Sequence, residues 1–435
     1  MKILIISSYF PPQNSIASLR PYSWAKYWSK IGHDVTVLTT NKTFHENDLK
    51  LDVSMFKIIS VPLWVPLKNA YQKEKKYIVN SNNLRLRLNI KQKALKIVKS
   101  YYDRFIEKTG CFYTCRFPDW HDIWARKAYK YVNNNNWDLV VSTGWPYSVH
   151  KIAYKLKKNN QAKKWVLDWR DLWTKNHLFP GLKIFNPIER FLENKFHKTA
   201  NYITTVSKGL AETLQIMTKT PVVVIFNGYD KEDFQNILLK TRICNKELVI
   251  VYTGTIYKDY QDPEPLFKAI SELLNEGSIG ERDIKLIFAG PKQTDVMYLA
   301  QKYNVLNVYE YKGFLPREEA LELQYNADIL LFLEYQSEQT KGVLTGKLFE
   351  YLYISKEIWA IGLNNDSEVG SLIEKSNSGI CLGKDIGRIK EEIIKKIQEK
   401  KQNKQKLTNK NQELLEIYDR EYQAKKMLEL VMDLH

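Results

Sequence analysis

Cysteine is scarce in this chain, and long apolar runs are missing from it. The 435 residues include four cysteines, too few and too scattered for a disulfide framework: Cys111, Cys115, Cys244 and Cys381. We therefore expect a reducing, cytoplasmic environment. No second Cys or His pair accompanies Cys111 and Cys115 at metal spacing, so no zinc site is predicted. No segment approaches the roughly 18 consecutive apolar residues of a spanning helix, and the start of the chain passes from Ile6 straight into polar Ser7, which predicts a buried strand rather than a signal peptide.

Signatures of several function classes are also absent. The sequence has no zinc-finger, RNA-recognition or homeodomain signature. It has no Walker A loop, no G-x-G-x-x-G fingerprint and no Asp-x-Asp pair at the end of an expected strand. The first three absences weigh against a nucleic-acid-binding protein, although the net charge of +17 and the aromatic content of 13% keep that class as an alternative.

The excess positive charge is confined to the first half of the chain. Residues 1–220 hold 37 Lys and Arg against 15 Asp and Glu, whereas residues 221–435 hold 29 against 34. The excess peaks in residues 62–110, with 12 basic and 3 acidic side chains. This asymmetry predicts an anionic partner met by one domain only: a membrane surface, a lipid-linked phosphate or a nucleic acid. A lysine-rich solvated face is the plainer explanation.

The pattern of the chain is that of two doubly wound α/β domains. With 44% hydrophobic and 26% charged residues, it has the composition of a globular protein, and its length predicts two domains. Expected strands lie at 2–7, 34–39, 56–61, 138–142, 165–168, 202–206 and 222–226, and the series restarts at 248–252, 285–289, 308–311, 329–332, 358–361 and 379–381. Helical periodicity separates them at 18–30, 150–158, 188–198, 208–215, 265–274, 295–302, 318–325 and 347–352.

We therefore predict two Rossmann-like parallel-sheet domains facing one another across a cleft. The N-terminal domain takes residues 1–235, with a basic insertion at about 62–118, and the C-terminal domain takes residues 236–417. A closing helix at 418–435 is expected to pack back on the N-terminal domain. Within the insertion, residues 77–102 mix apolar and basic side chains, as an interfacial amphipathic helix would.

Ligands of such sheets bind beyond the carboxyl ends of the strands, so the loops there are the candidate site. After the first strand, Asn14 and Ser15 open a helix whose free amides suit an anion, and Arg20 lies about one turn further in. Gly144 and Trp145 follow a later strand of the same domain.

Two further loops carry charge or glycine directly after a strand. Asp168, Arg170 and Asp171 suit a substrate hydroxyl, although a structural Asp–Arg pair is an equal alternative. In the second domain, Gly254 and Thr255 precede Lys258, where backbone amides and a cation can meet a phosphate.

The order of the short motifs resembles family 4 glycosyltransferases, which are retaining GT-B enzymes, many of them builders of bacterial surface polysaccharides. The likeness spans nearly the whole chain outside the insertion. It is carried by S8-Y-F-P-P12, D168-W-R-D-L-W173, V206-S-K208, F226-N-G-Y-D230, Y252-T-G254, F288-A-G290, G313-F-L315, A327-D328 and G346-K-L-F-E-Y-L352.

The resemblance implies a nucleotide-sugar donor, such as a UDP-sugar, bound by the C-terminal domain without an obligatory metal or other cofactor. Glu350 matches the second glutamate of the family's paired motif, which holds the ribose hydroxyls. The resemblance also implies that the other donor contacts come from Gly254, Thr255, Lys258, Gly290, Phe314, Leu315, Gly342, Val343, Leu344 and Lys347. Asp168, Asp171 and Lys258 are the expected catalytic residues, and Asn14, Ser15, Arg20, Gly144, Trp145 and Arg170 the expected acceptor contacts.

The sequence also departs from the family pattern. The first glutamate of the pair should stand eight residues before Glu350, where Gly342 is found, so backbone amides would have to meet the sugar hydroxyls. The family's frequent arginine before Lys258 is missing, and its N-terminal glycine pair is replaced by Asn14 and Ser15. These departures concern the donor sugar most directly.

The expected reaction is transfer of a hexosyl or N-acetylhexosaminyl group with retention, to a glycan or lipid-linked acceptor. The resemblance places such an enzyme in capsule, O-antigen or exopolysaccharide synthesis, at the inner face of the cell membrane, with an anionic membrane surface as a partner and no nucleic acid. Another GT-B nucleotide-sugar enzyme, such as an epimerase, is the nearer alternative.

Overall fold

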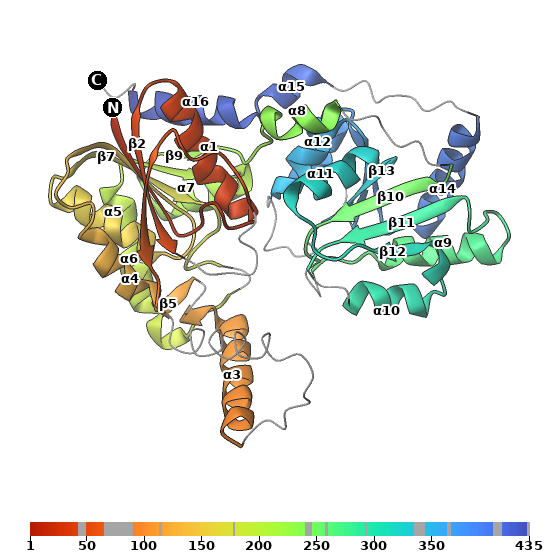
Figure 1. Cartoon of the computed structure of the whole chain (residues 1–435), viewed down its shortest axis with the longest axis horizontal. Coiled ribbons are helices and arrows are strands. Elements are labelled where there is room, and N and C mark those ends of the chain that lie inside the picture. The colour runs from red at the N-terminus through yellow and green to blue at the C-terminus, as the bar shows by residue number, and fades with distance from the viewer. Residues whose placement is uncertain are drawn as a thin grey trace. The chain divides into compact units, whose positions relative to one another are not determined.

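The computed structural model describes residues 1–41, 49–64, 90–112, 115–176, 179–239, 246–256, 260–291, 294–334, 344–362, 367–402 and 411–432 (Figure 1). The side chains of residues 90–96, 294 and 295 are outside this description. The chain forms two compact units. Unit 1 comprises Met1–Ile225 and Met427–His435, and unit 2 comprises Phe226–Lys426. The division therefore comes ten residues before the expected boundary at 235, which lies inside a helix of unit 2.

Unit 1 contains a seven-stranded parallel sheet in the order β3-β2-β1-β6-β7-β8-β9. Its strands are β1 (Lys2–Ser7), β2 (Asp34–Asn41), β3 (Lys57–Pro62), β6 (Trp137–Thr143), β7 (Ala162–Trp169), β8 (Tyr202–Thr205) and β9 (Val222–Val224). Its helices are α1 (Ile16–Lys30), α3 (Ile90–Thr109), α4 (His121–Tyr129), α5 (Ser148–Lys158), η1 (Lys183–Phe185), α6 (Asn186–Thr199) and α7 (Lys208–Met217). A short pair, β4 (Cys111–Phe112) and β5 (Arg116–Asp119), follows α3.

The core of unit 1 explains why its strands read as continuous apolar runs. Ile3, Leu4, Ile5 and Ile6 of β1 are all fully buried, because helices cover both faces of a parallel sheet. On one face, aromatic side chains of β7, α5 and α6 pack together with those of α4. On β7 and its following loop, Trp169 and Trp173 stack at 5.9 Å between ring centroids.

Unit 2 contains a six-stranded parallel sheet in the order β12-β11-β10-β13-β14-β15. Its strands are β10 (Leu248–Thr253), β11 (Ile284–Ala289), β12 (Tyr309–Tyr311), β13 (Ile329–Leu333), β14 (Glu357–Ile361) and β15 (Gly379–Gly383). Its helices are α8 (Lys231–Leu238), α9 (Glu264–Asn275), α10 (Thr294–Lys302), η2 (Leu306–Val308), α11 (Arg317–Asn326), α12 (Gly346–Ile354), α13 (Glu368–Lys375), α14 (Ile386–Lys401) and α15 (Gln412–Glu416). Every strand and helix expected from periodicity is found, within a few residues at each end.

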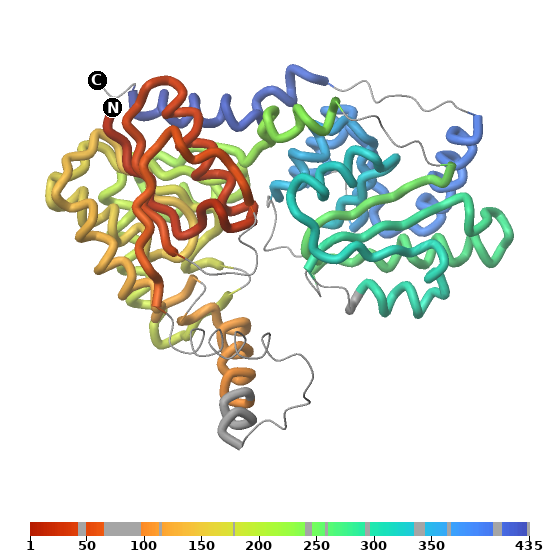
Figure 2. Tube along the Cα trace, in the orientation of Figure 1, coloured from red at the N-terminus to blue at the C-terminus, as the bar shows by residue number. Residues whose placement is uncertain are grey.

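The C-terminal helix and the insertion complete the chain. Helix α16 (Arg420–Met432) starts in unit 2 and ends in unit 1, where Lys164 donates a hydrogen bond to the Val431 carbonyl. Figure 2 shows α3 standing away from the sheet of unit 1. The amphipathic segment expected at 77–102 corresponds in part to this helix, which continues to Thr109; residues 77–89 lie outside the described residues. Within the described chain, no helix is long and apolar enough to cross a membrane.

Two buried histidines in the aromatic core of unit 1 link its stability to pH. His150 lies 2.8 Å from the Ser142 hydroxyl, and His197 accepts a hydrogen bond of 3.1 Å from the Trp169 indole. Burial lowers the pKa of His150 to about 3 and that of His197 to about 4. Below pH 6.5 these histidines become protonated in the unfolded chain but stay neutral in the folded chain. Each of them therefore lowers the free energy of unfolding as the pH falls.

His197→Gln keeps an acceptor for the Trp169 indole but cannot take up a proton. Between pH 7 and pH 5, we expect its free energy of unfolding to fall by about 2 kcal/mol less than that of the wild type. The measurement is urea unfolding of both proteins at the two pH values. Burial also raises the pKa of Glu193 to about 7, which acts in the opposite direction, but this carboxyl is common to both proteins and cancels. Equal pH dependence in the two proteins would contradict the assignment.

Candidate functional site

Three glycines bring the carboxyl ends of β10, β11 and β12 together in unit 2. Gly254 has a φ of +126°, and its N–H donates to the Ala289 carbonyl at 2.8 Å. Gly290 donates to the Gly313 carbonyl at 2.8 Å, and a Cβ on Gly290 would lie 2.1 Å from the Gly254 carbonyl oxygen. Only glycine fits such a contact, so two of the expected nucleotide contacts, Gly254 and Gly290, touch one another.

Lys347 lies over this glycine-lined edge, in the first turn of α12. A Cβ on Gly254 would be 2.9 Å from the Lys347 ammonium, which donates to the Tyr252 hydroxyl at 2.6 Å and lies 4.0 Å from the centre of its ring. Burial lowers the pKa of Lys347 to about 7, although the charge of Glu350 acts in the opposite direction. Lys347 forms no ion pair with any carboxylate of the described residues. A cation without a counter-ion, beside a glycine edge and a helix N-terminus, suits a phosphate.

The start of α12 has further unused polar groups. Thr345 occupies the N-cap position, but its hydroxyl caps no amide, and its buried Oγ1 has no hydrogen-bond partner among the described residues. The first amides of the helix are thus left without the side-chain acceptor that usually covers them. An anion bound here would meet both these amides and Lys347.

Glu350 is paired with an arginine that the sequence analysis did not identify. Arg317, the first residue of α11, donates to Glu350 Oε1 at 2.7 Å through Nη1 and to Asp233 Oδ2 at 2.7 Å through Nη2. Although burial opposes it, the charges of Glu350 and Asp233 raise the pKa of Arg317 above its ordinary value. Glu350 is buried, so it is not simply a solvent-exposed residue of the helix. Its Oε2 has no hydrogen-bond partner within the described chain.

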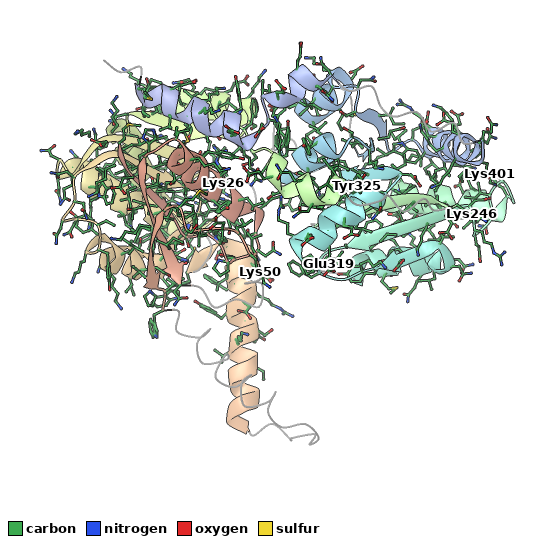
Figure 3. The ribbon with its side chains drawn as sticks, turned by 45° about the horizontal axis from the view of Figure 1, so that its top comes forward. Lys26, Lys50, Lys246, Glu319, Tyr325 and Lys401 are labelled. Carbon is green, nitrogen blue, oxygen red and sulfur yellow. The ribbon has the colours of Figure 1, made fainter. Side chains whose placement is uncertain are left out.

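The other expected donor contacts vary in exposure. Phe314 is 45% exposed, Leu315 is half-buried and Leu344 is fully buried. The Thr255 carbonyl accepts a hydrogen bond of 2.9 Å from the Tyr252 hydroxyl. Lys258, Gly342 and Val343 lie outside the described residues. Helix α11, which carries Arg317, is the one marked by Glu319 and Tyr325 in Figure 3.

In unit 1, Arg20 and Asp168 are paired with each other. Arg20 Nε donates to Asp168 Oδ2 at 3.1 Å and Nη2 donates to Oδ1 at 2.7 Å, while the hydroxyls of Thr143 and Thr204 donate at 2.6 and 2.8 Å. Burial raises the pKa of Asp168, but the arginine and the two hydroxyls outweigh it and hold the pKa below its usual value. All four acceptor positions of the carboxylate are filled. This geometry favours the structural alternative for Asp168, with Arg20 rather than Arg170 as its partner.

Arg170 instead joins the loops at the carboxyl edge of unit 1. Its Nη1 donates to the Ala17 carbonyl at 2.9 Å, and a Cβ on Gly144, whose φ is +72°, would lie 2.0 Å from its Nη2. The φ of Gly144 would strain any side chain there, and a Cβ would also displace the guanidinium. The structure thus brings the predicted acceptor residues Gly144 and Arg170 together with the start of α1, where the Ser15 hydroxyl accepts from the Ala17 amide at 3.2 Å.

The remaining predicted acceptor residues border this group. Asn14, Trp145 and Asp171 are all half-buried. The Trp145 ring meets Phe179 edge-on at 5.7 Å, and its indole N–H is buried with no partner among the described residues. An indole N–H in that position is available to a hydroxyl of a ligand. Among the described residues, no three His, Cys, Asp or Glu side chains come together as a metal site.

Comparisons with known proteins were made for the whole chain. A scan against protein-family models finds no match, and a search of curated proteins finds none. Among solved structures, sucrose-phosphate synthase from Thermosynechococcus elongatus has a TM-score of 0.60 at 11% identity, covering 100% of this chain and 99% of that one. The E. coli trehalose-6-phosphate protein bound with UDP-2-fluoro glucose has a TM-score of 0.61 at 10% identity, with 100% of both chains covered. UDP-GlcNAc 2-epimerase from Methanocaldococcus jannaschii has a TM-score of 0.53 at 12% identity, with 99% of both covered. The chain therefore has the GT-B fold, as its resemblance predicted.

Proposed function

We propose that this protein transfers a sugar from a nucleoside-diphosphate sugar to a glycan or lipid-linked acceptor, with retention at the anomeric carbon. The observation that carries the proposal is the Lys347 ammonium, which lies over Gly254 in the first turn of α12 and has no carboxylate partner among the described residues. The cation, the glycine-lined edge and the N-terminus of α12 all favour a diphosphate bound at this edge of the sheet. The fold shared with the UDP-2-fluoro glucose complex supports a nucleotide-sugar ligand there.

The donor is expected to extend from that point in both directions. The ribose hydroxyls meet the free Oε2 of Glu350, and the base lies near Gly290, Phe314 and Leu315. The sugar meets the loop that contains Gly342, Val343 and Leu344. Lys258, from the loop after β10, adds a second positive charge to the diphosphate.

The residues then act mainly on the leaving group. As the bond from the anomeric carbon to the diphosphate breaks, negative charge grows on the phosphate oxygens, and Lys347, Lys258 and the α12 amides stabilise it more than they stabilise the ground state. The acceptor oxygen bonds to the anomeric carbon on the same face that the diphosphate leaves, and the hydroxyl proton passes to the departing phosphate oxygen. Because the carboxylate of Asp168 is saturated, we assign the orientation of the acceptor to Asp171 and Arg170.

The acceptor side is proposed from charge. Unit 1 contains the basic excess, which suits a lipid-linked phosphate and an anionic membrane surface. We therefore propose a family 4 type hexosyl- or N-acetylhexosaminyltransferase of capsule, O-antigen or exopolysaccharide synthesis, which works at the inner face of the cell membrane.

A second candidate is an epimerase, which the shared fold of UDP-GlcNAc 2-epimerase favours. An epimerase converts its nucleotide sugar without an acceptor. Incubation of the protein with UDP-N-acetylglucosamine alone, followed by separation of the sugars, distinguishes the two functions.

The first prediction concerns Lys347 and pH. A bound diphosphate holds the ammonium in its charged form, whereas the free group has a pKa of about 7, so binding takes up a proton above that pH. We expect the affinity for UDP to fall between pH 7 and pH 8.5, by at most about tenfold per unit. Lys347→Met should weaken UDP binding about 10- to 100-fold at pH 7 and abolish this pH dependence. Isothermal titration calorimetry in two buffers measures both.

Lys375→Met, on the exposed end of α13, is the matched control and should bind UDP as the wild type does. Unchanged affinity in Lys347→Met would remove the observation on which the proposal rests.

The second prediction separates the ribose contact from the diphosphate contact. Glu350→Gln should weaken UDP about tenfold, the value of one hydrogen bond to a charged group, and leave inorganic pyrophosphate within about twofold. Arg317→Lys should show the same pattern, because an ammonium cannot hold two carboxylates as a planar guanidinium does.

Lys400→Met controls for general damage, since it breaks another largely buried ion pair of unit 2, with Asp328. It should lower the melting temperature without changing the ratio of the two affinities. If Glu350→Gln weakens UDP and pyrophosphate equally, Glu350 does not hold the ribose.

A further inference from the structure

Helix α6 and the turn η1 before it carry large apolar side chains on their outer side. Ile184 is 78% exposed, Ile188 is 44% exposed and Phe191 is 59% exposed. Ile188 and Phe191 are three residues apart and lie on one side of α6, and Ile184 precedes them in η1. We call Ile184, Ile188, Phe191 and the basic residues beside them the α6 face.

The acidic residues of the same helix point inward. Glu189 is fully buried: its carboxylate receives Arg116 Nε at 3.0 Å and the Phe117 amide at 2.7 Å. Glu193 is also buried and accepts hydrogen bonds from Thr174. A surface helix ordinarily buries its apolar side and exposes its charges, so the polarity of α6 is partly reversed.

The charges that α6 and η1 do expose are all positive. Lys183, Arg190, Lys195 and Lys198 are exposed, and none of them forms an ion pair with a carboxylate of the described residues. The Lys195 ammonium lies 4.3 Å from the centre of the Phe191 ring, so apolar and cationic groups are interleaved. The α6 face is therefore both apolar and uniformly basic.

The α6 face is fixed firmly to the rest of unit 1. Arg116 Nη1 donates to the carbonyls of Trp173 and Phe179 at 3.1 and 2.9 Å, in addition to its pairing with Glu189. The Phe185 ring meets Phe117 edge-on at 5.1 Å. The exposure of Ile184 and Ile188 thus belongs to a well-anchored element rather than to a loose end.

A second exposed apolar stripe lies on α3, whose last residue is joined to the segment before η1. The Gly181 N–H donates to the Thr109 carbonyl at 3.0 Å, which joins the segment before η1 to the end of α3. Helix α3 exposes Ile97, Val98 and Tyr101, of which Tyr101 is 69% exposed. Unlike the α6 face, α3 also exposes acidic residues, Asp103 and Glu107.

We propose that the α6 face docks on an anionic lipid bilayer, with Ile184, Ile188 and Phe191 in the boundary between headgroups and acyl chains and the lysines and arginine at the level of the lipid phosphates. Interleaved apolar and basic groups are what an interfacial helix requires. A second copy of the chain fits less well, because a symmetric contact would press one basic face against another. This inference rests on the membrane part of the proposed function and names the surface responsible.

The test is flotation of the full-length protein with vesicles of phosphatidylcholine alone or of phosphatidylcholine and phosphatidylglycerol in a 2:1 ratio. The wild type should bind the anionic vesicles at low salt, and less so at high salt because the lipid charge is screened. Ile184→Ser with Phe191→Ser should lower the partition coefficient at least tenfold, and Arg190→Gln with Lys195→Gln about fivefold or more.

Two control variants show whether the loss belongs to this face. Ile216→Ser removes an equally exposed apolar residue, 84% exposed on α7, and should bind vesicles as the wild type does. Val98→Ser with Tyr101→Ser tests α3 separately. All the changed side chains are exposed, so the melting temperatures should stay within a few degrees of the wild type.

The outcomes separate this inference from the proposed function. Wild-type affinity in both α6 variants, with loss only in the α3 variant, would overturn the α6 face and leave the membrane proposal standing. No vesicle binding by the wild type would overturn both, whereas a dimer that Ile184→Ser dissociates would overturn the α6 face alone. Vesicle binding that depends on the α6 face in a protein that binds no UDP would support the inference and refute the transferase.

Discussion

A fully buried ion pair between Arg20 and Asp168 holds the carboxyl edge of unit 1 together. Its members come from α1 and the end of β7, 148 residues apart in sequence, and Thr143 and Thr204 add the ends of β6 and β8. The arginine reaches further, to the Ile225 carbonyl at the last residue before unit 2. Two charges can remain buried only if every hydrogen-bonding group around them is paired, so this contact fixes three strands and a helix in one arrangement. The loops with Gly144, Arg170 and Ser15 take their positions from it.

The same physical rule applies to other buried charges of the molecule. The buried carboxylates of Asp168, Glu189 and Glu350 each meet an arginine, respectively Arg20, Arg116 and Arg317. A guanidinium suits this use because its planar set of donors can satisfy two oxygens at once. Within the described residues, Lys347 has no carboxylate partner, and the indole N–H of Trp145 and the hydroxyl of Thr345 have no hydrogen-bond partner. These three groups lie close to the carboxyl edges of the sheets, where a ligand can complete them.

The sequence was sufficient to predict the strands, the helices and the two parallel sheets, because both depend on local periodicity that the chain shows clearly. The resemblance to a glycosyltransferase family named Gly254, Gly290 and Lys347 as donor contacts, and the structure brings these three residues side by side. The sequence could not assign Asp168 to Arg20, because the residues that surround a buried carboxylate come from distant elements. Arg317 was missed for the same reason, as it begins a helix in no recognisable motif. The periodicity of 188–198 indicated a helix, yet it gave no sign that Arg116 would draw Glu189 inward and leave the isoleucines outside.

In the proposed function, the choice of lysine at position 347 has a consequence for turnover. An arginine would stay cationic whatever surrounds it, and would attract any small oxyanion to an empty site. Because burial sets the pKa of Lys347 to about 7, a large share of resting molecules at neutrality hold an uncharged amine there. Free phosphate is then attracted only weakly. The nucleotide product can dissociate as Lys347 releases its proton to water. In the proposed transferase, the desolvated amine that strengthens donor binding therefore also makes that binding reversible.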